Sequence, residues 1–157
     1  MKTPTLDNFI RKYGKEEGNK RWKLYTKNKS KFYSQISQEL FIQIEKELGN
    51  KYTYFYGENE IQLKHEYGVY YYVFYIKELN KIIEFNGDIF HANPKYFKED
   101  ECPNPFNKDL TAKEIWKKDK KKLKLLKDNK IDYLIIWEDD YKENPVKELK
   151  RCIHFLI

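Results

Sequence analysis

The spacing of apolar and polar residues changes character along the chain, and each change marks a predicted element. Between residues 34 and 48 apolar side chains recur every three or four positions, which predicts an amphipathic helix that stops at Gly49. Between residues 51 and 86 apolar and polar residues alternate and aromatic residues are dense, which indicates strands. We expect a hairpin at the end of this region, and four strands near 51–56, 60–65, 68–76 and 80–86.

The C-terminal part alternates between helix and strand. A helix is predicted over residues 111–128, where Thr111 and Glu114 have the spacing of a capping box. Asp119 falls on the apolar stripe of this helix, and because a lone buried charge is costly we expect it to have a histidine, a lysine or a metal as partner. Residues 131–137 are apolar almost throughout, which is typical of a strand covered on both faces and parallel to a neighbour.

Three further segments complete the predicted organisation. Residues 5–29 form two short basic helices around Gly14 and Gly18, residues 92–110 form a long loop rich in proline and asparagine, and residues 145–157 form a last helix or strand. The chain is therefore expected to be α/β, with a mixed central sheet flanked by helices in the order αβββαβ. Its predicted parts are a basic helical N-terminal segment, 1–31, and an α/β domain, 32–157.

Composition limits the classes of partner. The chain of 157 residues has a net charge of +6, and only three of its 31 basic residues are arginine. Such a lysine excess favours contacts to a phosphate backbone over reading of base edges, but it is equally compatible with an A/T-rich genome. No apolar segment approaches a membrane span and no signal-peptide core begins the chain, so we expect an intracellular, cytoplasmic protein without a membrane partner.

Polar residues gather at the end of the strand predicted near 80–86. Glu84 and Asn86 are two residues apart and share one face of the strand, and Asp88 and His91 follow within the turn after Gly87. Such a cluster at a strand end is where catalytic groups commonly collect, and a solvated strand end with incidental polar residues is the alternative. Cys102 and Cys152, the two cysteines, form no recognisable zinc pattern with the histidines.

Two motifs resemble the very-short-patch-repair branch of the PD-(D/E)XK nuclease superfamily. The string NGDIFH, residues 86–91, is similar to the glycine-containing turn of that branch, and IWKKDKKKLKLLKDNKIDYLIIWED, residues 115–139, is similar to its aspartate-bearing helix and following strand. The IEFNGD-x-x-H-x-NPK string and the N-terminal FIRKYGKEEGNKRW segment look like those of phage-encoded, homing-type endonucleases. The resemblance covers nearly all of the chain.

The resemblance implies a restriction-endonuclease-like core and a metal-dependent endonuclease that hydrolyses duplex DNA in a phage or its bacterial host. It implies that His91 acts as general base with Asp119 behind it, and that Glu84 and Asn86 occupy the acid-x-Lys positions. Glu84 and Asp88 would hold Mg²⁺ or Mn²⁺. Glu39, Glu138 and Lys120 would support the site. The residues expected to contact double-stranded DNA are Lys117, Lys121, Lys124, Arg21 and Lys95.

One departure from the family pattern leaves a second function open. The metal-binding aspartate of the family would fall on Val73, eleven residues before Glu84, and no acid occurs between Tyr67 and Lys77. Either Glu66, Glu78 or Asp88 replaces it, or the protein is a DNA-binding protein with weak or no cleavage activity. A third hypothesis is an interaction module, whose tyrosine-rich strands engage another protein.

Overall fold

The computed structural model describes residues 6–29 and 34–157, and the chain divides into two compact units, residues 1–34 and 35–157. The domain boundary expected between residues 31 and 32 lies outside the described residues.

The first unit contains the two predicted helices, α1 (Leu6–Tyr13) and α2 (Lys15–Lys29). Gly14 separates them with φ of +82°, a backbone conformation that favours glycine. Gly18 lies so close to α1 that an added Cβ would stand 2.6 Å from the Cα of Ile10. The rings of Phe9 and Trp22 meet edge to face, with their centroids 5.6 Å apart. The unit is a tight helical hairpin that depends on two glycines.

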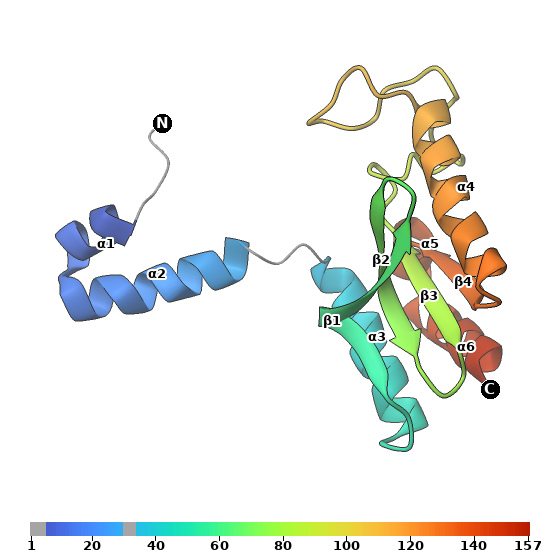
Figure 1. The fold of residues 1–157 in the computed structure, drawn as a ribbon, viewed down its shortest axis with the longest axis horizontal. Helices are drawn as coiled ribbons and strands as arrows, with labels where there is room; N and C mark the ends of the chain where they lie inside the picture. The colour runs from blue at the N-terminus through green and yellow to red at the C-terminus, as the bar shows by residue number, and fades with distance from the viewer. Residues whose placement is uncertain (1–5, 30–33) are drawn as a thin grey trace. The chain divides into compact units, whose positions relative to one another are not determined.

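The second unit is an α/β domain with a four-stranded mixed sheet (Figure 1). The sheet order is β1-β2-β3-β4, with β1, β2 and β3 antiparallel and β4 parallel to β3. This confirms the expected α/β class, with a mixed sheet flanked by helices. The elements are α3 (Gln35–Leu48), β1 (Tyr54–His65), β2 (Gly68–Ile76), β3 (Lys81–Asn86), α4 (Ala112–Asp128), β4 (Asp132–Trp137), α5 (Glu138–Glu143) and α6 (Pro145–Leu156).

The two faces of the sheet pack against different helices. On one face, Phe41 of α3 stacks on Phe74 of β2 with ring centroids 4.8 Å apart, and Cys152 of α6 joins the same core. On the other face, Leu126 of α4 packs with Tyr72 and with further apolar residues of the sheet. Because α4 covers the face that carries Glu84 and Asn86, it is the helix that can bring side chains to the end of β3.

The strand prediction for residues 51–65 was wrong in one respect. The structure has one strand, β1, where two strands were expected. Tyr56 pairs with Phe74 and Ile61 pairs with Tyr72, so the four residues from Gly57 to Glu60 oppose Val73 alone. Gly57 has φ of +64°, and this irregularity bends the strand without ending it. The turn-like residues of this stretch therefore mark a bulge.

Apart from α5, which was not predicted, the remaining elements follow the predictions closely. The hairpin of β2 and β3, the long connection between β3 and α4 without helix or strand, and the parallel alignment of β4 with β3 are all present. The last segment, left open as helix or strand, is the helix α6. No helix in the described part of the chain is long and apolar enough to cross a membrane.

The capping box of α4 gives a test of this part of the fold. The Thr111 hydroxyl accepts a hydrogen bond from the Glu114 amide at 3.3 Å, and the Glu114 carboxylate accepts one from the Thr111 amide at 2.9 Å. We expect Thr111→Ala to lower the free energy of unfolding by about 1 kcal/mol in urea denaturation, because one end of this pair is lost. Thr111→Ser, which keeps the hydroxyl, should retain most of the stability; equal losses in the two variants would contradict this role.

Candidate active site

His91 and Asp119 form a hydrogen bond across the groove between the β3–α4 loop and α4. His91 Nδ1 lies 2.8 Å from Asp119 Oδ2, and each side chain is about three-quarters buried. Close to these two residues in sequence, Trp116 Nε1–H of α4 donates a hydrogen bond to the Ala92 carbonyl at 2.7 Å, which connects the loop to the helix. A carboxylate at Nδ1 favours the tautomer that carries its proton there, which leaves Nε2 as a proton acceptor. The partner expected for Asp119 is thus a histidine.

These two residues line an open groove of about 540 Å³. We call it the dyad groove. Its walls are the β1–β2 hairpin, the β3–α4 loop and α4. Lys122 and Lys118 reach it from α4, and Phe90 reaches it from the loop. The imidazole is therefore accessible to a bound molecule, next to lysine side chains that attract anions.

Glu84 is buried and ion-paired. Its side chain is 5% exposed, and its Oε2 lies 2.6 Å from Nζ of Lys122, whose side chain is 17% exposed. The Lys122 ammonium also lies 4.8 Å from the centre of the Tyr72 ring. Unlike the exposed lysines of α4, Lys122 points inward from the helix, one helical turn after Asp119. It offsets the charge that Glu84 brings into the protein.

The second Glu84 oxygen occupies a gap between strands. Strands β2 and β3 pair only beside their turn, at Tyr75 with Ile82 and at Ile76 with Lys81. Farther along, the Val73 amide donates to Glu84 Oε1 at 3.3 Å. A side chain thus replaces the backbone acceptor that a regular ladder would supply. Because β2 and β3 do not pair here, Glu84 of β3 can contact both the Val73 amide and Lys122 of α4.

Glu60 is an acidic neighbour of Glu84 that was not predicted from the sequence. It lies in the β1 bulge opposite Val73, the position where the family resemblance placed an aspartate. Burial raises the pKa of Glu60, the negative charge of Glu84 raises it further, and Lys122 acts in the opposite direction. The available signal was the break at residues 57–59, which was interpreted as the end of one strand, with Glu60 as the first residue of the next.

The three acids considered as replacements at Val73 lie elsewhere. The Glu78 carboxylate accepts hydrogen bonds from the Thr53 amide and hydroxyl, at 2.8 and 2.6 Å. Glu66 lies in the turn between β1 and β2. Asp88 follows β3, and its Oδ1 accepts a hydrogen bond from Asn93 Nδ2 at 2.7 Å.

The end of β4 supports the turn after β3. Glu138 Oε2 accepts a hydrogen bond from the Asp88 amide at 3.4 Å, and its other oxygen is ion-paired with Lys142. Lys95, expected to contact DNA, lies 2.6 Å from Asp139, which raises the pKa of the lysine and lowers that of the aspartate. Glu138 thus contacts the turn after β3, and its expected role at the site stays a prediction, while Lys95 is engaged within the protein.

The other predicted residues lie at the end of β3, on α3, in the first unit and on α4. Asn86 is buried at the end of β3, opposite Trp137 of β4. Glu39 is exposed on α3, and its charge contributes to the raised pKa of Tyr141. Arg21, in the first unit, is ion-paired with Glu17 at 2.7 Å. The predicted lysines that are exposed on α4 are Lys117, Lys120, Lys121 and Lys124.

The acidic residues permit a limited metal site. Mg²⁺ uses one or two protein carboxylates and fills its other positions with water and substrate phosphate. Glu84 and Glu60 are close enough for the charge of one to act on the other, but Lys122 and the Val73 amide already contact the two Glu84 oxygens. Among the described residues, one group of three acids could converge on an ion, and it consists of Asp139, Asp140 and Glu143 rather than the predicted ligands.

Comparisons of this chain with protein-family models, with curated proteins and with solved structures found no match. The functional interpretation therefore depends on the geometry and chemistry of the site.

The ion pair between Glu84 and Lys122 predicts strong coupling between two substitutions. Lys122→Met should lower the free energy of unfolding by about 3–5 kcal/mol at pH 7, because it leaves a buried carboxylate without its cation. The double variant Glu84→Gln/Lys122→Met should be more stable than Lys122→Met alone. Urea denaturation at pH 7 measures this, and additive losses would contradict the pairing.

From the raised pKa of Glu60 we predict that the stability of the protein depends on pH. Because its folded pKa lies above the unfolded value, wild-type stability should fall as the pH rises from the unfolded pKa through the folded one. Glu60→Gln should remove this component and raise the denaturation midpoint at pH 7. Glu58→Gln is the matched control, since Glu58 is an exposed glutamate of the same strand. Equal effects of the two substitutions would contradict the idea that the charged form of Glu60 lowers the stability of the protein.

Proposed function

We propose that this protein is a metal-dependent endonuclease that hydrolyses phosphodiester bonds in duplex DNA, with a restriction-endonuclease-like core. The observation that carries the proposal is the His91–Asp119 hydrogen bond of 2.8 Å, beside the buried Glu84–Lys122 pair and in a lysine-lined groove. A histidine held by a carboxylate can take a proton from water near pH 7. The lysines on the same groove favour a phosphate-bearing substrate.

Each residue has a defined task in this proposal. Nε2 of His91 accepts the proton of the attacking water, while Asp119 fixes the ring and stabilises the imidazolium that forms. Lys118, an exposed lysine on the same groove, adds the positive charge that attracts the phosphate. Mg²⁺ or Mn²⁺ held by one or two carboxylates, Glu84 and Glu60, and otherwise by water and substrate phosphate would polarise the phosphate and lower the pKa of bound water.

A second candidate is a DNA-binding protein that has this fold but no cleavage activity. Two observations favour it: Val73 occupies the expected aspartate position, and Lys122 already occupies an oxygen of Glu84. A lysine and a metal ion compete for the same carboxylate. This candidate predicts salt-dependent DNA binding without a metal-dependent product.

Nicking of supercoiled plasmid and of phage or host DNA, in Mg²⁺, Mn²⁺ or EDTA, separates the two candidates. We expect wild-type nicking to require the metal and His91→Ala to lower its rate roughly 10²- to 10⁴-fold, the usual contribution of a general base. Asp119→Asn should lower the rate as well, because it removes the charge behind the imidazole. His154→Ala and Asp109→Asn are matched controls at exposed positions.

Each outcome supports one candidate. Undiminished cleavage by His91→Ala would rule out the assigned base. Salt-dependent binding without any cleavage of these DNAs would favour the DNA-binding protein.

A further inference from the structure

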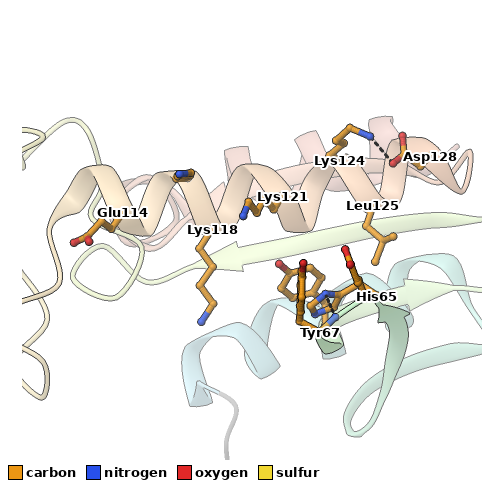
Figure 2. A pocket seen from close by; sticks show the side chains of 11 residues that line it. His65, Tyr67, Glu114, Lys118, Lys121, Lys124, Leu125 and Asp128 are labelled. Atoms are coloured by element: carbon orange, nitrogen blue, oxygen red, sulfur yellow. Dashed lines mark hydrogen bonds and ion pairs between the residues drawn. The ribbon is translucent and has the colours of Figure 1, made fainter.

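A second groove lies between the tip of the β1–β2 hairpin and α4. It has a volume of about 700 Å³, and we call it the lysine groove. Figure 2 shows His65 and Tyr67 on one side and side chains of α4, among them Lys118, on the other. Its α4 wall is mainly basic, and its four lysines are Lys117, Lys118, Lys121 and Lys124.

The aromatic wall is preorganised. His65 and Tyr70 are stacked, with ring centroids 4.2 Å apart and an angle of 15° between their planes. The Tyr67 amide donates to His65 Nδ1 at 3.3 Å, which further holds the imidazole. Tyr67 itself is 85% exposed. An exposed ring beside a fixed stack is a surface on which a flat molecule can stack.

The charge of the groove is positive despite its acidic residues. Asp128 is ion-paired with Lys124 at 2.7 Å, and Glu114 is used by the capping box, where its hydrogen bonds with Thr111 lower its pKa. Four lysines against Glu66, Glu114 and Asp128 leave the groove with a net charge of +1, and Lys117, Lys118 and Lys121 make no ion pair with an acidic residue of the groove. The combination of lysines and aromatic rings fits a polyanion that carries flat bases.

The lysine groove continues into the dyad groove. The two share four lining residues: His65, Tyr67, Tyr70 and Lys118. A strand lying along the lysines would therefore pass the aromatic wall before it reaches His91. This continuity connects the aromatic wall to the proposed site of cleavage.

We propose that the lysine groove binds an unpaired, single-stranded segment of nucleic acid, with its phosphates along α4 and a base stacked on Tyr67. Inside a duplex each base is stacked between its neighbours, so away from the duplex ends a base must be unpaired to present its face to these rings. A protein partner is less suited, because lysine is depleted at the centres of protein interfaces. That this segment lies beside a cleaved strand rests on the proposed nuclease function. The substrate class would then be duplex DNA that carries a single-stranded branch.

Fluorescence anisotropy with labelled oligothymidine and with a blunt duplex of equal length tests the proposal, in EDTA to prevent cleavage. We expect Tyr67→Ala to weaken binding of the single strand roughly 5- to 150-fold, the range for loss of one stacked base, and to weaken duplex binding much less. Tyr67→Phe should keep the affinity. Phe106→Ala is the control, because Phe106 is 87% exposed and does not line the lysine groove.

The lysines are tested by the dependence of binding on salt. Lys117→Gln/Lys121→Gln should reduce the slope of log affinity against log salt by about 1.4 for the single strand, about 0.7 for each lost phosphate contact. Lys147→Gln/Lys150→Gln removes the same charge from exposed positions of α6 and should leave the slope unchanged. An equal change of slope in both double variants would overturn the assignment of these lysines.

The outcomes separate this inference from the proposed function. Unchanged single-strand affinity in Tyr67→Ala, or equal loss for the strand and the duplex, would overturn it, even if the wild type nicks DNA. Tyr67-dependent binding without any metal-dependent nicking would support the groove and count against the nuclease. Absence of nucleic-acid affinity at low salt would overturn both and favour a protein partner for the tyrosine-rich hairpin.

Discussion

The buried ion pair between Glu84 and Lys122 is the constraint on which the candidate site depends. A carboxylate that is 5% exposed needs a cation close by, and here the cation comes from another element, α4. The second Glu84 oxygen accepts from the Val73 amide, so the same side chain connects β2, β3 and α4. At this point β2 and β3 are joined by the Glu84 side chain in place of backbone pairing, and the ion pair connects α4 to the sheet.

The position of α4 then determines what each of its faces does. Leu126 packs into the core, and Asp119 and Lys122, one turn apart, reach the β3–α4 loop and β3. The outward lysines of the same helix line a groove. A period of 3.6 residues is enough to divide one lysine-rich helix into a packing face, a face of ion pairs and a basic face.

Burial gives residues of the same type different roles. Lys121 is exposed and adds to the positive field, whereas Lys122 is buried beside Glu84 and its charge is largely neutralised. A metal ion at Glu84 would have to share the carboxylate with this lysine. The Glu84–Lys122 pair therefore stabilises the domain while it limits how strongly the site can hold a cation.

The sequence by itself determined the locally encoded features: the capping box at Thr111, the apolar strand β4, and a partner for Asp119, for which the motif suggested His91. These follow from short spacings and from the cost of burying a charge. The tertiary structure decided that Lys122 turns inward, that β1 continues through a bulge, and that Glu60 lies near Glu84. These features depend on pairing between segments far apart in the chain, which a one-dimensional pattern does not contain, because a single residue of register decides which side chains meet.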